Sequence, residues 1–316
     1  MSNKIFRSKN DFLFLTGGSN AASKLYTRSG FENSIDSNGW RHTIERRIRR
    51  CERANIRFCQ LIIPEKLTVV PLDDQDRMSV FGSSDGILPP GERLLQSVLE
   101  TQLIYPKDFL ISQYIKYPIY SATDSHWTWI GAFSAFQILI NYFGLEINYT
   151  SLLNLPRTIH RYHGDLWDPS LQNIELDSFE RIELPHNIRR IYCNGMVGTK
   201  EMYNAENDTG LHVGSQCIFY NSLAQRQETV ILFGTSFSEY RIETSLLTAL
   251  FAYFFNTVHF IWSTSLDFHY IERHRPDLVI SELPERFLTS CPDDKLELEA
   301  FTAERISAWR STRKTD

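Results

Sequence analysis

The strongest constraint on the fold is one apolar run that ends in a glycine turn. Residues 228–233 read Glu-Thr-Val-Ile-Leu-Phe and are followed directly by Gly234. A run of β-branched and aromatic residues of this kind fills a strand that is buried on both faces, as in a parallel sheet covered by helices. The run therefore indicates an α/β fold.

The rest of the chain alternates between strand-like and helix-like patterns, which favours an α/β sheet with crossover helices. Strands are predicted at 57–63, 229–233, 258–261 and 277–280, and helices at 39–54, 91–102, 129–143, 246–255 and 267–274. Residues 155–225 crowd Tyr, His, Asn and Asp together and predict an irregular or β-rich insertion near the functional crevice. No linker divides the 316 residues, so a single domain spanning 1–316 is expected.

A serine follows the central strand in the string Gly-Thr-Ser-Phe-Ser, where Ser236 is the third residue. A serine at the carboxyl end of a strand, entering a helix, lies where open α/β sheets bind ligands. The amino terminus of such a helix would offer free N–H groups to an oxyanion. The hydroxyl still needs a base to take its proton and a third group to orient that base.

Asp124 and His126 can supply those two groups, since alternate residues of an extended segment point to the same side. The apolar residues that follow predict that this pair lies on a loop entering a helix. Either string alone is more often a surface turn or a helix N-cap. Together they indicate nucleophilic catalysis by serine.

Further segments match one known family. The chain resembles the SGNH-hydrolase-like domain of the alginate O-acetyltransferase (AlgX/AlgJ) family over most of its length. The most specific match is Thr123-Asp124-Ser125-His126-Trp127-Thr128, and the others are residues 10–20, 61–71, 131–132, 219–221, 233–238, 275–282 and 285–288. The resemblance implies an SGNH-like, flavodoxin-like central parallel sheet with flanking helices.

Carried over residue by residue, the resemblance implies Ser236 as nucleophile, His126 as general base and Asp124 as the acid that orients it. As in that family, the Asp-x-His pair precedes the serine. The Ser236 backbone N–H is the first expected oxyanion donor. Asn221 is either a second donor or a turn residue at a strand end.

The implied activity is transfer of an acyl group, most simply acetyl, to sugar hydroxyls of a polysaccharide through an acyl-serine, without a cofactor. The partners would be a glycan acceptor and an acyl donor, which could be acetyl-CoA in the cytoplasm. One alternative is a carbohydrate O-acetyl esterase that uses the same triad. Another is a carbohydrate-binding scaffold of a polysaccharide assembly system that keeps the fold but has lost catalysis. No segment resembles the family's carbohydrate-binding module, and a nucleotide-dependent enzyme is disfavoured because no phosphate-loop string is present.

Aromatic and cationic residues near these strings are candidates for sugar contacts, with packing as the alternative for each. They are Trp127, Trp129, Tyr162, Trp167, Tyr240 and Arg241.

Four other features receive structural interpretations. His160, His163 and Asp165 lack a fourth ligand at a recognisable spacing, so no metal site is predicted. Arg46, Arg47, Arg49 and Arg50 predict the solvated face of an amphipathic helix and not a nucleic-acid site, in a chain of net charge −5. Glu282, Glu285 and Arg286 predict an internal Arg–Glu bridge. Five cysteines without a Cys-x-x-Cys spacing indicate neither a zinc site nor a disulfide framework.

The amino-terminal residues contain no apolar signal segment, and no apolar run is long enough for a transmembrane helix. A complete chain of this kind is expected in the cytoplasm, and one whose leader was removed in the periplasm.

Overall fold

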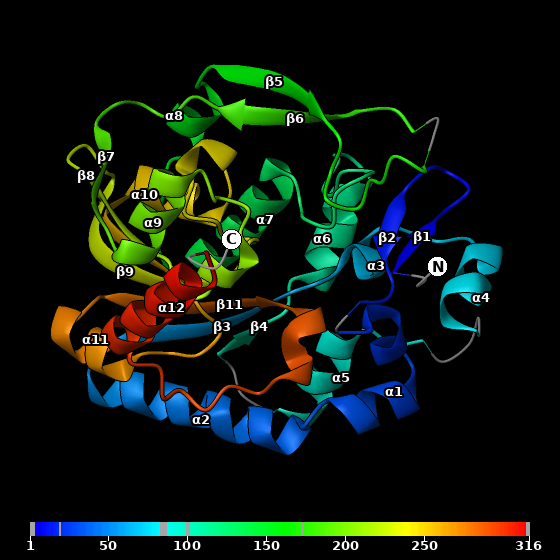
Figure 1. The fold of residues 1–316 in the computed structure, drawn as a ribbon, viewed down its shortest axis with the longest axis horizontal. Helices are drawn as coiled ribbons and strands as arrows, with labels where there is room; N and C mark the ends of the chain where they lie inside the picture. The colour runs from blue at the N-terminus through cyan, green and yellow to red at the C-terminus, as the bar shows by residue number, and fades with distance from the viewer. Residues whose placement is uncertain (1–3, 19, 83–86, 99–101, 172–173, 314–316) are drawn as a thin grey trace.

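The fold is built around one seven-stranded sheet, seen in a computed structural model that describes residues 4–18, 20–82, 87–98, 102–171 and 174–313 (Figure 1). Across the sheet the strands follow the order β4-β3-β11-β9-β10-β8-β7. Their bounds are β3 Arg57–Ile63, β4 Leu103–Ile104, β7 Ile188–Cys193, β8 Gln216–Asn221, β9 Arg226–Gly234, β10 Phe255–Trp262 and β11 Leu278–Pro284.

The sheet is mixed, so the expectation of a parallel sheet holds only in part. Neighbours from β4 to β10 pair in parallel, whereas β8 is antiparallel to both β10 and β7. Residues 222–225 join β8 to β9 in a short turn. A connection this short reverses the chain direction, because a parallel crossover needs a dozen or more residues.

Helices cover both faces of the sheet, which explains the unbroken apolar run in β9. Val230 and Leu232 pack into the core beneath α7 and α10, and Ile231 and Phe233 pack into the core beside α2, α5 and α11. Figure 1 shows α7 and α10 above the sheet and α2 below it. The helices are α1 Arg28–Ser34, α2 Ser37–Arg53, α3 Lys66–Val69, α4 Asp74–Phe81, α5 Pro90–Ser97, α6 Lys107–Tyr114, α7 Trp129–Tyr142, α8 Thr150–Leu153, α9 Gly195–Tyr203, α10 Leu247–Phe254, α11 Phe268–His274 and α12 Leu298–Arg313.

The four predicted strands and five predicted helices are all confirmed; β3 has its predicted bounds, and the others have shifted ends. The helix predicted at 91–102 is α5 and ends at Ser97, and part of the predicted range lies outside the described residues. The strand matched in residues 10–20 is β2, Leu13–Leu15. It pairs with β1, Ile5–Arg7, in a separate two-stranded ribbon instead of joining the main sheet.

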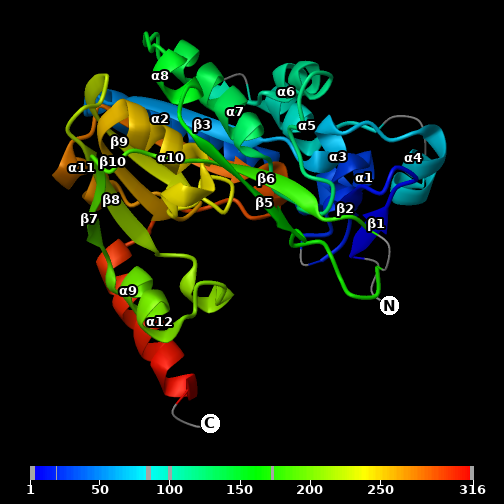
Figure 2. The ribbon, with the colours of Figure 1, turned by 90° about the horizontal axis from the view of Figure 1, so that it is seen from above.

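The region 155–225 is only partly the insertion that its composition predicts. Its first part is a two-stranded hairpin of β5 (Arg157–Tyr162) and β6 (Asp177–Ile182), which lies outside the main sheet. Its second part adds β7 and β8 to that sheet. Between them lies the helix α9, which packs beside α12, and the two helices project from the body of the molecule (Figure 2).

The described residues include no helix long and apolar enough to cross a lipid bilayer. All five cysteines are free, and Cys51, Cys59 and Cys217 are buried.

The basic run on α2 is not entirely a solvated face. Arg47 has no exposed surface, and its guanidinium lies 2.6 Å from Asp294, whose side chain is 1% exposed. Arg47 also donates to Gln60 of β3 and Ser281 of β11. Helical spacing places this arginine on the sheet side of α2, where buried acceptors replace water.

This burial makes the stability of the fold sensitive to Arg47. We expect Arg47→Ala to lower the free energy of unfolding by about 3–5 kcal/mol, because Asp294 loses its buried partner and keeps only the partly exposed Arg46 as a countercharge. Arg49→Ala is the matched control on the same helix, since the Arg49 side chain is 58% exposed, and should cost less than about 1 kcal/mol. Urea unfolding followed by circular dichroism measures both, and equal losses would contradict this role.

Candidate active site

The turn that carries Ser236 is fixed by a buried glutamate. Glu282 of β11 accepts hydrogen bonds from Thr235 N and Thr235 Oγ1, both at 2.8 Å, and from Ser238 Oγ at 2.6 Å. Burial raises the pKa of Glu282 against these three donors. The Glu282 carboxyl therefore anchors the turn on both sides of Ser236, at Thr235 before it and at Ser238 after it.

Gly234 is needed because the turn approaches that glutamate closely. A Cβ at this position would lie 2.8 Å from Ser238 Oγ and 2.9 Å from Glu282 Oε2, closer than real Cβ contacts allow. The glycine that ends β9 in the sequence is thus explained by crowding around the Glu282 carboxyl.

Residues 122–126 form a loop on the other side of the site, and the charged side chains of Lys66 and Asp177 hold it. The Lys66 ammonium donates to Leu13 O at 2.9 Å and to Ala122 O at 3.2 Å. Burial lowers the pKa of Lys66 to about 8, although nearby acids including Asp124 oppose this effect. Asp177 accepts from Ala122 N and from both Thr123 N and Thr123 Oγ1.

The two segments meet in a continuous chain of hydrogen bonds. Ser236 Oγ lies 2.7 Å from His126 Nε2, and His126 Nδ1 lies 2.7 Å from Asp124 Oδ1. The same Asp124 oxygen accepts from the His126 backbone N–H at 2.8 Å. The loop then enters α7, whose N-cap is Thr128. The structure thus brings Ser236, His126 and Asp124 together in the order that a nucleophile, its base and an orienting acid require.

Charges around the imidazole favour its protonated form. Burial alone would lower the pKa of His126, but the charge and hydrogen bond of Asp124, together with the charge of Asp165, raise it above the ordinary 6.5. Burial alone would raise the pKa of Asp124, but the charge and hydrogen bonds of His126 outweigh burial and hold this pKa well below its usual range.

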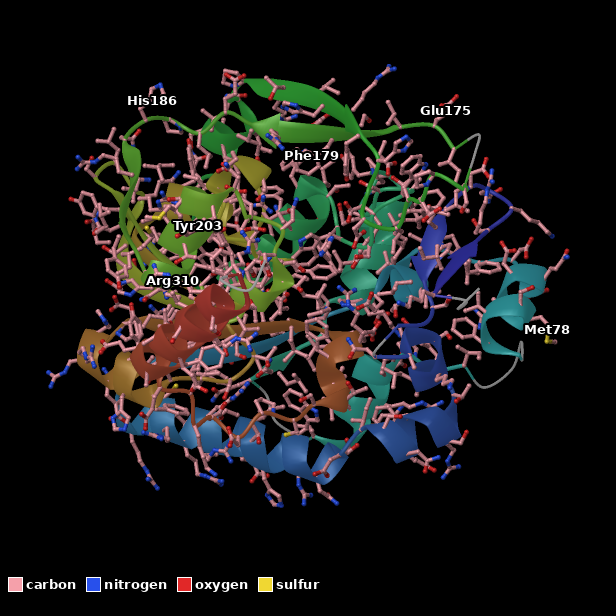
Figure 3. The ribbon with its side chains drawn as sticks, viewed as in Figure 1. Met78, Glu175, Phe179, His186, Tyr203 and Arg310 are labelled. Carbon is pink, nitrogen blue, oxygen red and sulfur yellow. The ribbon has the colours of Figure 1, made fainter. Side chains whose placement is uncertain are left out.

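A cavity of about 1030 Å³ opens onto these residues. Ser236, His126 and Asp124 line it together with Tyr162, Phe179 and Arg241. Figure 3 shows Phe179 of β6 below its strand, toward the body of the molecule, whereas Glu175 and His186 lie on the outer side. The β5–β6 hairpin therefore forms one wall of the cavity.

Three potential metal ligands also gather here, since ligand atoms of Asp124, His126 and Asp165 lie within 4.8 Å of one another. Both imidazole nitrogens are already hydrogen-bonded, one to Asp124 and one to Ser236. His160 and His163 line the cavity but do not join this group among the described residues. The arrangement therefore favours serine chemistry over metal binding.

Comparison with solved structures shows which proteins share the fold that carries this site. No family model and no curated protein sequence matches the chain. PatB1 of Bacillus cereus is 15% identical over 90% of this chain and 97% of its own, with a TM-score of 0.59. The O-acetyltransferase domain of Pseudomonas putida AlgJ is 15% identical over 96% of this chain and 99% of its own, with a TM-score of 0.51. AlgX of Pseudomonas aeruginosa is 12% identical over 91% of this chain and 67% of its own, with a TM-score of 0.51.

The chain has the SGNH-like fold of AlgJ and AlgX. The fold inferred from the sequence resemblance is thereby confirmed.

The prediction that Asn221 could be a second oxyanion donor is wrong. Asn221 ends β8, which runs antiparallel to β10, so it lies at the opposite end of the sheet from Ser236. Its side-chain amide donates to Ala252 O and Tyr253 O and accepts from Asn187. Asn221 is therefore the strand-end turn residue that the sequence left as the alternative.

The serine turn also differs from the expected entry into a helix. Residues 236–238 form a turn, and the next α-helix, α10, begins only at Leu247. The Ser236 N–H therefore belongs to a turn and not to a helix amino terminus. Among the described residues no hydrogen bond engages the Ser236 N–H, so its predicted role stays open.

The candidate sugar-binding residues separate into two groups. Trp127, Tyr162 and Arg241 line the cavity, although the Trp127 indole also donates to Phe237 O at 2.9 Å and is buried. Trp129, Trp167 and Tyr240 are not among the lining residues. Trp129 donates to Glu180, Trp167 stacks on His163, and Tyr240 is buried near Lys200.

The predicted Arg–Glu bridge exists with a different acid. Arg286 Nη1 lies 2.9 Å from both carboxylate oxygens of Glu65, and both side chains are buried. Glu285 instead accepts from Tyr26, Glu65 N, Gly91 N and Tyr105. Sequence reasoning missed the roles of Glu282 and Asp177, since both act on partners far away along the chain.

The close approach at Gly234 gives a direct test of the turn. We expect Gly234→Ala to destabilise the fold by about 1–3 kcal/mol, because the added methyl group must displace Glu282 or Ser238. Gly198→Ala is the matched control in α9, where a Cβ meets nothing within 4 Å, and helix propensity predicts up to about 1 kcal/mol of stabilisation. Thermal unfolding measures both, and a neutral Gly234→Ala would refute the crowding argument.

Proposed function

We propose that this chain is an O-acyltransferase, most simply an O-acetyltransferase, that acts on hydroxyl groups of a glycan through an acyl-serine. The observation that carries the proposal is the hydrogen-bonded series Ser236–His126–Asp124 at the edge of a large cavity. The fold shared with the AlgJ O-acetyltransferase domain supports it. PatB1, which has the same fold, was also solved with a sulfonyl adduct.

In the first half-reaction His126 Nε2 takes the proton of Ser236 Oγ as that oxygen attacks the acyl carbon of an activated donor. The tetrahedral oxyanion is stabilised by the Ser236 N–H. As the intermediate collapses, the leaving group departs with the proton from His126. Ser236 then carries the acyl group as an ester.

In the second half-reaction a sugar hydroxyl in the cavity gives its proton to His126 and attacks the acyl-serine. Collapse releases the O-acylated sugar and returns the proton to Ser236. Water in place of the sugar would give hydrolysis through the same steps. Tyr162 and Arg241 on the cavity wall are the side chains that we assign to glycan contacts.

The test is intact-mass spectrometry of the wild type and Ser236→Ala after exposure to 4-nitrophenyl acetate, with and without oligosaccharides. We expect one added acetyl group in the wild type only, discharged faster by an oligosaccharide than by water. Equal discharge by water would indicate an esterase. No labelling of the wild type would indicate a carbohydrate-binding scaffold, and labelling of Ser236→Ala would exclude Ser236 as the nucleophile.

The raised pKa of His126 predicts the pH dependence of acylation. Only neutral imidazole can accept the serine proton, so the rate should be present above this pKa and lost as the pH falls through it. Asp124→Asn removes the main charge that raises the pKa, so this acid limb should move to lower pH. The rate should also fall on the order of 10⁴-fold, because the imidazole loses its orienting acceptor.

Stopped-flow release of 4-nitrophenol between pH 4 and 9 would measure both effects. An unchanged rate and pH profile in Asp124→Asn would contradict the role of the Asp124 carboxylate.

A further inference from the structure

The segment that joins β5 to β6 holds the loop that carries the base. Gly164 N donates to Thr123 Oγ1 at 2.8 Å, and Leu166 N donates to Thr123 O at 3.0 Å. Asp177 at the start of β6 adds its hydrogen bonds to Ala122 and Thr123. This part of the insertion is therefore joined to the catalytic loop and does more than wall the cavity.

Asp165 makes the most direct of these contacts. Its Oδ1 accepts from Ser125 N at 2.6 Å, and its Oδ2 accepts from Ser125 Oγ at 2.7 Å. Ser125 is buried and lies between Asp124 and His126 in the chain. A carboxylate that fixes both polar groups of Ser125 restricts the backbone on which the base and its orienting acid both depend.

The backbone geometry explains how this carboxylate reaches the loop. A Cβ on Gly164 would lie 2.5 Å from both Asp124 Cα and Asp124 N. Only glycine permits this approach, and it brings the next residue, Asp165, beside Ser125.

Asp165 also contributes charge. Its Oδ2 lies 3.9 Å from His126 Nδ1. The charged groups that act on this imidazole are Asp124 and Asp165, which favour its protonated form, and Arg286, which opposes it. The Asp165 side chain is 46% exposed, so part of its charge is screened by water.

We propose that Asp165 is a positioning residue for His126, which fixes the Asp124–His126 loop through Ser125 and places a second negative charge beside the imidazole. The proposal rests on the acyl-serine chemistry proposed above. The proposal makes the insertion a structural part of the catalytic apparatus. Its contact with Ser125 fixes the geometry of the loop, and its contact with His126 supplies charge.

The two contributions can be separated with three variants. Asp165→Asn keeps a side chain that can hydrogen-bond Ser125 but removes the charge, so we expect a near-normal maximal acylation rate and an acid limb at lower pH. Ser125→Ala keeps the Asp165 charge but loses one hydrogen bond, so the rate should fall with the acid limb unmoved. Asp165→Ala loses both, and should lower the maximal rate about tenfold or more while also moving the limb.

Asp168→Asn is the matched control, since this acid lies in the same segment and accepts from Ser170, away from the base. It should leave both the rate and the pH profile unchanged. The readout is the pre-steady-state acylation of Ser236 by 4-nitrophenyl acetate across pH, with thermal unfolding to show that each variant is folded.

If wild-type Ser236 is acylated but Asp165→Asn keeps the wild-type acid limb, the charge contribution is refuted. If Asp165→Ala also acylates at the wild-type rate, the positioning role is refuted as well. A wild type that is not acylated at Ser236 would instead overturn the proposed function, so the two failures are distinguishable.

Discussion

The hydrogen bond between Ser236 Oγ and His126 Nε2 is the contact on which the functional architecture depends. It joins two segments that are 110 residues apart in the chain. Neither segment belongs to a regular element at the point of contact, so their geometry must come from what holds each one. The serine turn is held by Glu282 of the sheet, and the histidine loop by Lys66, Asp165 and Asp177.

Buried charge is used in the same way throughout this end of the molecule. Glu282, Glu285, Arg47 and the Arg286–Glu65 pair are each buried and each hydrogen-bonded at several atoms. Taking such groups out of water is costly, and only complete pairing offsets the cost. Well-packed apolar residues could stabilise a core equally well, but they could not aim the Thr235 N–H or the Ala122 carbonyl. The polar network therefore fixes the geometry of loops that apolar side chains alone would leave free to move.

Local sequence patterns predicted much of this structure, and long-range pairing explains what they did not predict. The apolar run of β9 and the periodicity of α2 and α7 depend on neighbours along the chain, so the strands and helices that they predict are confirmed. The prediction that Asn221 could be an oxyanion donor is wrong because the direction of β8 depends on its pairing with β10. The prediction of a solvated face is wrong at Arg47 because its acceptor, Asp294, lies 247 positions away. Asp124 and His126 could be recognised because they are two positions apart, whereas Asp165 contacts Ser125 from 40 positions downstream.

The central claim is that His126 activates Ser236 as the nucleophile of this site. The most direct measurement is tandem mass spectrometry of peptides after exposure to a sulfonyl fluoride, with the wild type and His126→Ala treated in parallel at neutral pH. The account predicts one modified residue, Ser236, in the wild type and almost none in His126→Ala, because the hydroxyl then has no base. Modification at another serine, or equal modification of Ser236 without the histidine, would contradict it.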